Sequence, residues 1–307
     1  MSAETPELNV VTGAFGYTGK YIARKLLASG RRVRTLTGHP ERPNPFGEQV
    51  SVAPLNFECP ERLVEDLRGA TTLYNTYWIR FGHRRVTFDH AVDNTITLIR
   101  AARDAGVGRI VHISITNASL ESPLPYFKGK AIVEQAVVES GLPYAIIRPA
   151  VIFGFEDILL NNIAWLLRRF PVFVVPGRGG YSLQPVYVED LAELAVDAGL
   201  RRDNLAFDAV GPEVYTFDQL VRLIADCVNS RARTLHLRPG LALFASKLLG
   251  LLVKDVLLTR DEVDALRSDL LVSPHPATAP TSLADWLRQN AARIGAGYTS
   301  ELSRHYR

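Results

Sequence analysis

The stretch LNVVTGAFGYTG, residues 8–19, is an apolar run followed at once by three glycines in a GxxGxxG pattern. The apolar run predicts a strand, and the residues after it, GKYIARKLLASG, predict a helix that ends near Gly30. In such a unit Gly13 permits the tight turn, Gly16 lets a ligand approach the backbone, and Gly19 lets the helix pack closely on the strand. The amides and the dipole at the helix start attract phosphate. The stretch therefore predicts a dinucleotide-binding turn made by Thr12, Gly13, Phe15, Gly16, Tyr17 and Gly19.

The chain after this turn alternates short β-type runs with amphipathic stretches. RRVRTLTG, QVSVAPLNF, ATTLYNTY and GRIVHIS predict further strands, and LPYAIIRPAVIFG, residues 142–154, predicts one more. This order predicts right-handed βαβ units and an α/β fold, a doubly wound parallel sheet of the Rossmann type. The alternation weakens after Gly154. We expect a dinucleotide-binding domain over residues 1–155, with a returning segment near 186–211, and a smaller, mostly helical substrate or partner lobe over 156–307.

Composition and charge exclude several classes of protein. The chain has 307 residues, 47% hydrophobic and 22% charged, which is ordinary for a soluble globular protein. A net charge of +3 with scattered arginines predicts no nucleic-acid partner. The first residues do not resemble a secretory signal, and Cys59 and Cys227 lie in no metal-ligand spacing, so we expect a cytoplasmic protein without a metal site. The most apolar stretch, residues 241–258, is short for a bilayer crossing, and we favour a buried helix over one on a membrane surface.

The end of the second predicted strand bears on the choice between NAD(H) and NADP(H). An acidic residue there typically binds the ribose 2′-hydroxyl of NAD. The segment Thr37-Gly38-His39 holds no carboxylate, and these residues, with Arg42, offer hydrogen-bond donors to a 2′-phosphate. A merely exposed loop is the alternative interpretation. We expect NADP(H) to be favoured over NAD(H).

A tyrosine and a lysine in the second half of the expected nucleotide domain are candidates for acid–base chemistry. Tyr126 and Lys130 lie four residues apart on a predicted helix and so share one face. Tyr21 and Lys25 have the same spacing in the first helix, so spacing alone does not decide. The position of Tyr126 and Lys130, soon after the strand GRIVHIS, favours them.

Several segments occur in an order that resembles the extended and atypical branches of the short-chain dehydrogenase/reductase superfamily. These are the GxxGxxG turn, NTITLIRAARDAGVGRIVHIS, YFKGK and QPVYVEDLA, and the resemblance covers roughly residues 8–230. It includes NAD(P)-dependent epimerases and dehydratases, NmrA-like redox sensors, and an accessory subunit of respiratory complex I that carries NADPH without turning it over. FGFEDILLNNIA and LTRDEVDALRSDL resemble that accessory subunit in particular.

The resemblance assigns roles to individual side chains. It implies that Tyr126 exchanges a proton with the substrate oxygen, while Lys130 lowers the pKa of Tyr126 and binds the nicotinamide ribose. Ser114, with Thr116 as the second choice, would hold the substrate carbonyl. The expected nucleotide contacts beyond the glycine turn are Thr37, Gly38, His39, Asn56, Phe57, Asn75, Thr76, Tyr126, Lys130 and Pro149. Two departures weaken this pattern, because NmrA-like proteins usually carry Arg where Gly38 stands and the superfamily usually carries an acid where Asn56 stands.

Two functions follow from this reading. The first is an oxidoreductase or epimerase-type enzyme that applies Tyr–Lys acid–base chemistry to a small molecule. The second is a non-catalytic NADPH-binding sensor, or an accessory or assembly protein of a respiratory complex, peripheral at the inner face of a membrane. The first is favoured, and the substrate and oligomeric state stay open.

Overall fold

The computed structural model describes residues 7–82 and 86–305 and divides the chain into two compact units. Unit 1 contains residues Met1–Pro149 and Glu189–Asp208. Unit 2 contains Ala150–Val188 and Ala209–Arg307. The chain therefore leaves unit 1, enters unit 2, and returns to unit 1 for one helix and a strand before it leaves again.

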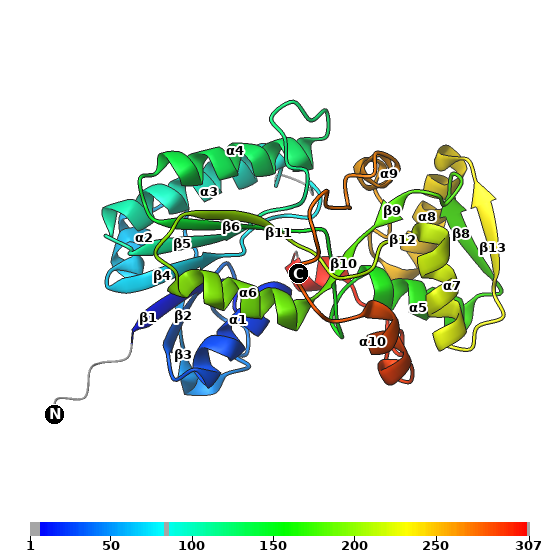
Figure 1. Cartoon of the computed structure of the whole chain (residues 1–307), viewed down its shortest axis with the longest axis horizontal. Helices are drawn as coiled ribbons and strands as arrows, with labels where there is room; N and C mark the ends of the chain where they lie inside the picture. The colour runs from blue at the N-terminus through cyan, green and yellow to red at the C-terminus, as the bar shows by residue number, and fades with distance from the viewer. Residues whose placement is uncertain (1–6, 83–85, 306–307) are drawn as a thin grey trace. The chain divides into compact units, whose positions relative to one another are not determined.

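Unit 1 is built on a seven-stranded sheet in the order β11-β6-β5-β4-β1-β2-β3 (Figure 1). The strands are β1 (Leu8–Thr12), β2 (Arg32–Thr37), β3 (Val50–Pro54), β4 (Ala70–Asn75), β5 (Arg109–Ile113), β6 (Tyr144–Pro149) and β11 (Leu205–Ala209). The first six pair in parallel, and the strand order reverses between β1 and β4. This reversal is the switch point at which doubly wound sheets bind ligands. The predicted α/β fold is confirmed.

Helices cover both faces of this sheet (Figure 1). One layer consists of α2 (Pro60–Leu67), α3 (Phe88–Asp104) and α4 (Pro125–Glu139), and the other contains α1 (Tyr17–Ala28) and α6 (Val188–Leu200). Leu63, Leu98 and Val133 belong to the same buried cluster as Val10 and Ile110 of the sheet, so apolar burial holds the first layer in place. The start of α1 directly follows β1, which positions its N-terminus at the switch point.

Unit 2 packs helices around three two-stranded sheets, β10-β7, β12-β9 and β13-β8. Its strands are β7 (Val151–Phe153), β8 (Val172–Pro176), β9 (Ser182–Leu183), β10 (Pro185–Tyr187), β12 (Tyr215–Thr216) and β13 (Arg233–Leu237). Its helices are α5 (Leu159–Arg169), α7 (Phe217–Cys227), α8 (Pro239–Val253), α9 (Arg260–Arg267), α10 (Leu283–Asn290) and α11 (Glu301–His305). Phe153, Leu160, Leu220 and Trp286 share one buried cluster. A capping box in which Thr216 accepts from the amide of Gln219 starts α7.

The segment 142–154 is two strands, so the prediction of one strand is wrong. β6 ends at Pro149, and β7 pairs with β10 in unit 2. Proline has no N–H to donate to a sheet, which makes it a natural point for a strand to end. The carbonyl of Pro149 still accepts a hydrogen bond from the amide of Thr116 at 3.0 Å.

The apolar segment 241–258 is also placed differently from the expectation of a buried helix. α8 ends at Val253, and within it only Ala242 and Gly250 are buried, whereas Phe244, Leu251 and Leu252 are exposed. No helix among the described residues combines the length and the apolar character needed to cross a membrane. The helix was predicted correctly, but its burial was not.

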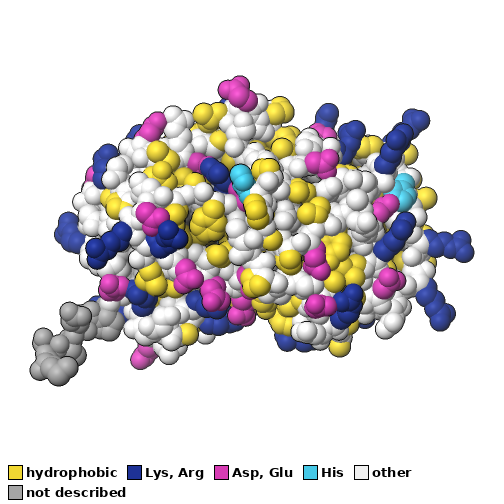
Figure 2. Space-filling model, viewed as in Figure 1, with side chains coloured by type: hydrophobic (Ala, Val, Ile, Leu, Met, Phe, Trp, Pro, Cys, Tyr) yellow, Lys and Arg dark blue, Asp and Glu magenta, His cyan; other side chains and the backbone are white. Residues whose placement is uncertain are grey.

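The charged side chains are distributed differently over the two units (Figure 2). Lys, Arg, Asp and Glu side chains intermingle on the visible face of unit 1, whereas Lys and Arg dominate the visible part of unit 2 that holds β8, β13 and α8. The mixture of positive and negative side chains on unit 1 agrees with the scattered positions of its arginines in the sequence.

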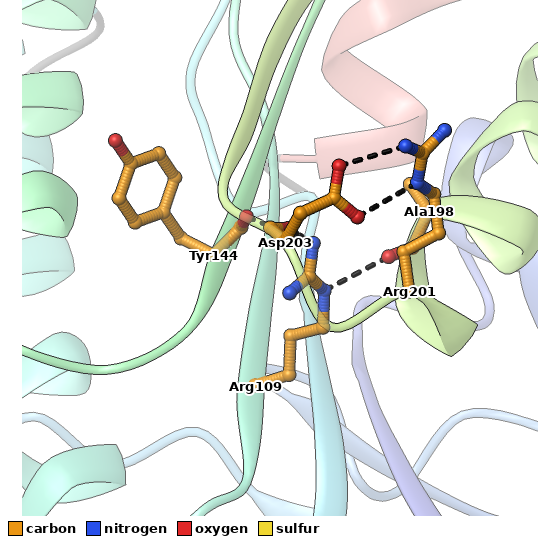
Figure 3. A network of polar contacts seen from close by, with 5 residues as sticks. All are labelled: Arg109, Tyr144, Ala198, Arg201 and Asp203. Carbon is orange, nitrogen blue, oxygen red and sulfur yellow. Dashed lines mark hydrogen bonds and ion pairs between the residues drawn. The ribbon is translucent and has the colours of Figure 1, made fainter.

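Arg109 is a buried cation that ties β5 to the segment returning from unit 2 (Figure 3). Its Nε donates to the carbonyl of Ala198 at 2.8 Å, and its Nη2 donates to the carbonyls of Tyr144 and Asp203 at 2.9 and 2.8 Å. Ala198 lies in the last turn of α6, where a cation favourably meets unpaired carbonyls. The exposed pair between Arg201 and Asp203 adds little because solvent screens it.

Replacement of Arg109 tests this connection. Arg109→Met would leave three carbonyls without their donor, and we expect the free energy of unfolding to fall by about 3 kcal/mol. Urea denaturation followed by circular dichroism measures the change. Arg201→Met is the matched control and should leave the midpoint nearly unchanged. Equal midpoints for wild type and Arg109→Met would contradict the assigned role.

Candidate functional site

The glycine turn between β1 and α1 has a backbone that larger residues could not adopt. Gly13 has φ of +66°, a left-handed conformation that favours glycine. A Cβ on Gly19 would lie 2.4 Å from the carbonyl oxygen of Gly13, so the first turn of α1 rests directly on the loop. Gly16 is the N-cap of α1 and has no side chain to cap the helix. The start of α1 can therefore be covered by an anion such as a pyrophosphate.

Thr12 fastens this turn to the end of the neighbouring strand β4. Its Oγ1 accepts from the amides of Thr76 and Tyr77 at 2.8 and 3.0 Å, and its carbonyl accepts from Thr76 Oγ1 at 2.6 Å. On the other side, Thr35 Oγ1 of β2 accepts from the amide of Ala14 at 3.0 Å. These bonds hold the carboxyl ends of three strands around one loop. The hydroxyls of Thr12 and Thr76 thus hold the backbone of the predicted site in place.

The loop after β2 carries a carboxylate, Glu41, between His39 and Arg42. Thr37 Oγ1 accepts from the amide of His39 at 3.1 Å, and the amide of Arg42 donates to the carbonyl of His39 at 3.2 Å. Glu41 Oε1 lies 3.4 Å from His39 Nδ1. Thr37, His39 and Arg42 are therefore brought together in a tight turn, and Glu41 joins them. Gly38, between Thr37 and His39, has open space where a side chain would stand.

The residues after β3 adjoin those after β4. Asn56 is exposed, and its Oδ1 accepts from the amide of Glu58 at 3.0 Å. The rings of Phe57 and Tyr77 are in contact, with centroids 5.0 Å apart. Asn94 of α3 donates to the Tyr77 hydroxyl at 2.9 Å, and burial raises the pKa of Tyr77. Phe57 thus packs on Tyr77, a residue that was not among the predicted contacts.

Lys130 on α4 is fully buried at the end of β5. Its Nζ donates to the carbonyl of Ile113 at 2.8 Å, and Ile113 directly precedes Ser114. Burial lowers the pKa of Lys130 to about 7, and the charge of Glu134 opposes this effect. Glu134, one turn further along α4, forms a bidentate pair with Arg148 of β6, so α4 is fastened to the sheet on this side. Lys130 is thereby held beside Ser114.

Trp78 lies against both Lys130 and Tyr126. It was not among the residues predicted for the site. Lys130 Nζ lies 4.6 Å from the centre of the Trp78 ring, and the Tyr126 ring meets the same indole edge-on at 5.9 Å and 85°. A Cβ on Gly129 would lie 3.0 Å from the indole, so the glycine of YFKGK makes room for it. The structure therefore brings Tyr126 and Lys130 to one aromatic side chain that enters from the loop after β4.

Ser114 follows the last residue of β5 and is buried. Its amide donates to the carbonyl of Ile147 at 2.7 Å. Among the described residues, its Oγ has no hydrogen-bond partner. Buried hydroxyls are normally paired, so this oxygen suits a ligand group. Thr116 and Pro149 lie just beyond it and are joined by the backbone bond described above.

A buried polar pair lies beneath the site. Asn75 Nδ2 donates to His112 Nδ1 at 3.1 Å, and both side chains are completely buried. Burial, assisted by the charge of Lys130, holds the pKa of His112 well below its ordinary value. The ring is therefore neutral, and it carries its proton on Nε2. We expected Asn75 to face the nucleotide, but its side-chain amide donates to His112 inside the protein. In the sequence, the signal for this pair is a histidine within the apolar strand GRIVHIS.

These features fit a bound dinucleotide. The glycine turn admits no Cβ at Gly19, the first turn of α1 faces the switch point without a side-chain cap, and the buried Ser114 Oγ has no partner in the part of the chain that the structure describes. The three features lie at the carboxyl ends of β1 and β5, the edge where doubly wound sheets bind nucleotides.

Comparisons with known proteins agree with this geometry. A family model described as NAD(P)H-binding matches residues 13–155. Sterol demethylase protein B of Methylococcus capsulatus is 30% identical over 290 residues, covering 81% of both chains. The mitochondrial NADH dehydrogenase 1 alpha subcomplex subunit 9 of Arabidopsis thaliana is 26% identical over 284 residues, 86% of this chain and 70% of its own length. The structure of MoeE5 in complex with UDP-glucose and NAD superposes with a TM-score of 0.70 at 20% identity, covering 93% of this chain and 97% of that one.

The chain belongs to the extended short-chain dehydrogenase/reductase superfamily. It contains an NAD(P)-binding domain and has the fold of the superfamily's epimerases and reductases. The predicted family and the predicted binding of a nicotinamide dinucleotide are confirmed at this level.

A substitution at Gly19 tests the turn. Gly19→Ala places a methyl group against the Gly13 carbonyl and pushes α1 away from the loop, so we expect NAD(P)H binding to weaken by about tenfold or more. Titration calorimetry measures the affinity. Gly180→Ala, at a position with open space, is the control and should bind as wild type does. Unchanged affinity in Gly19→Ala would show that the nucleotide lies elsewhere.

The buried Lys130 predicts a pH dependence of stability. Its pKa of about 7 in the folded chain lies below the ordinary 10.5, so between these values the unfolded chain binds more protons. The free energy of unfolding therefore gains a contribution that grows as pH rises from about 7 to about 10, and Lys130→Met removes it. Urea denaturation of the protein without nucleotide at pH 7 and 9 measures the slope. Lys128→Met, exposed on the same helix, should keep the slope. The same slope in Lys130→Met would contradict the assignment.

Proposed function

We propose that this chain is an NAD(P)(H)-dependent oxidoreductase or epimerase-type enzyme for a small molecule. The observation that carries the proposal is the placement of Lys130. Its buried ammonium is bonded to the carbonyl beside Ser114 and lies one helical turn from Tyr126. A hydroxyl that has no bonded partner among the described residues and a buried lysine thus lie at one end of β5, and the phenol lies one turn away on α4.

These groups suit the handling of a proton at a substrate oxygen. When bound, the nicotinamide dinucleotide supplies or accepts the hydride. Ser114 Oγ donates a hydrogen bond to the substrate oxygen and orients it. Tyr126 gives a proton to that oxygen or takes one from it, and a cationic Lys130 nearby favours the phenolate. Because burial brings the pKa of Lys130 to about 7, its charge is sensitive to whatever occupies the site.

The Tyr126 phenol can be tested against the matched pair in the first helix. Tyr126→Phe should lower kcat by about a hundredfold or more, because the proton donor is lost while the ring packing on Trp78 remains. Steady-state rates over a panel of carbonyl and nucleotide-sugar substrates measure this, and nucleotide affinity should change less than about twofold. Tyr21→Phe, in the other YxxxK pair, should leave kcat unchanged. If Tyr126→Phe turned over as fast as Tyr21→Phe, Tyr126 would not be the acid–base group.

One observation favours a second function, a protein that holds NADPH without turning it over. The Trp78 indole contacts both the ammonium of Lys130 and the ring of Tyr126, the two groups that turnover would use. Relatives named as subunits of NADH dehydrogenase support an accessory role in a respiratory complex. Under this function, purified protein retains nucleotide, oxidises none of it with any substrate, and is indifferent to Tyr126→Phe.

We also propose that NADP(H) is preferred. A cavity of about 440 Å³ opens beside α1 and the segment before β3. It is lined by Lys20, Arg24, Leu27, Ala28, Pro45, Phe46 and Gln49. Lys20 and Arg24 in this lining, and Arg42 in the loop after β2, favour the 2′-phosphate of NADP(H). Glu41 beside His39 opposes it.

Arg42→Gln separates these contributions. Loss of the guanidinium should weaken NADPH binding by about tenfold and leave NADH binding unchanged, because only NADPH carries the 2′-phosphate. Titration calorimetry with both nucleotides measures this, and Arg62→Gln, exposed on α2, is the control. Wild type that binds NADH more tightly than NADPH would contradict the preference.

A further inference from the structure

The helix α8 of unit 2 presents a row of large apolar side chains to solvent. The exposed fractions are 57% for Leu241, 60% for Phe244, 52% for Leu248, 75% for Leu251 and 77% for Leu252. Counted from Leu241, the other four lie three, seven, ten and eleven residues further along the chain. This spacing places all five on one side of the helix. We call this set the α8 ridge. The two buried residues of the helix, Ala242 and Gly250, lie on the opposite side.

The small size of these inner residues explains why the ridge points outward. A Cβ on Gly250 would lie 2.6 Å from the carbonyl oxygen of Asp255, whose amide donates to the carbonyl of Gly250. The helix therefore packs through its small side and leaves its large residues uncovered. Burying five such side chains would be favourable in proportion to the apolar area removed from water, so their exposure on a free surface is costly.

The chain segment that carries the ridge is cationic, although Asp226 and Asp255 flank it and Asp218 bonds His236 of β13. Residues 227–254 contain five cations and no Asp or Glu, in a chain whose net charge is only +3. The cations are Arg231, Arg233, Arg238, Lys247 and Lys254. Lys247 lies on α8 and Lys254 directly follows the last residue of the helix, and both are exposed. Figure 2 shows Lys and Arg side chains projecting from this part of unit 2.

We propose that the α8 ridge docks on an anionic lipid bilayer, with α8 lying in the plane of the membrane surface. Leucine and phenylalanine side chains enter the boundary between headgroups and acyl chains, and the flanking cations meet lipid phosphates. Lysines can bury their stems along an apolar surface while their ammonium groups stay at the headgroups. The 15 residues of α8 span roughly 22 Å at 1.5 Å per residue, less than the roughly 30 Å of a hydrocarbon core, so the helix lies on the bilayer.

The composition of the ridge favours lipid over a protein partner. Hot spots of protein interfaces are enriched in Trp, Tyr and Arg, none of which stands on the ridge, and a protein partner would need a groove complementary to the helix. The ridge offers four leucines and one phenylalanine on a single helix, which need no shaped partner. The proposal is independent of turnover at Tyr126, because α8 belongs to unit 2 and the nucleotide residues belong to unit 1.

Vesicle flotation of the full chain tests the proposal. The chain should float with phosphatidylcholine vesicles that contain phosphatidylglycerol, bind pure phosphatidylcholine at least about fivefold less, and lose binding as salt rises. Leu251→Ser with Leu252→Ser should lower the partition coefficient by about tenfold or more, because the two most exposed residues no longer insert. Lys247→Gln with Arg233→Gln should lower it by about tenfold on the anionic vesicles alone.

Leu200→Ser, an exposed leucine of α6 in unit 1, is the matched control and should float as wild type does. Circular dichroism and NADPH titration of each variant check that the fold and the nucleotide site are intact. Failure of wild type to float with anionic vesicles, or equal flotation of the Leu251/Leu252 variant, would overturn the proposal. A wild-type dimer in sedimentation velocity that the same variant converts to monomer would overturn it too, and would assign the ridge to a second copy of the chain.

Discussion

The approach of the first turn of α1 to the loop at Gly13 is the constraint on which the nucleotide site depends. Only a residue without a Cβ at position 19 allows it, since a methyl group would lie 2.4 Å from the Gly13 carbonyl. The hydroxyl of Thr12 then secures the loop to the end of β4 through two backbone amides. The helix start, the switch point and the strand ends are therefore one connected arrangement, and a pyrophosphate would meet amides already in place.

The same sheet edge carries the second part of the site. β5 delivers Ser114, and α4, fastened to β6 by Glu134 and Arg148, delivers Lys130 and Tyr126. Trp78 joins this arrangement, because its indole lies in the space left by Gly129 and contacts both side chains. The two functional hypotheses make different predictions for this ring, since only turnover needs Lys130 and Tyr126 to be available to the nucleotide and the substrate.

The glycine turn, the alternation of strands and helices, and the position of Tyr126 and Lys130 on one helix could be predicted, because each rests on local backbone requirements or on helical spacing. The contacts of Trp78 and His112 could not. Trp78 meets residues about fifty positions away, and Asn75 meets His112 across neighbouring strands, so these contacts depend on the tertiary fold. The burial of α8 was mispredicted because apolar composition alone does not say which side of a helix finds a partner. At Pro149 the missing N–H was visible in the sequence, yet the apolar residues on either side suggested one continuous strand.

The most direct measurement is a crystal structure of the chain with bound NADPH. We expect a pyrophosphate at the start of α1 and a nicotinamide ribose within hydrogen-bonding distance of Lys130 Nζ, with the Trp78 ring moved away from the ammonium. A structure in which Trp78 stays against Lys130 and the ribose binds elsewhere would contradict the enzymatic account.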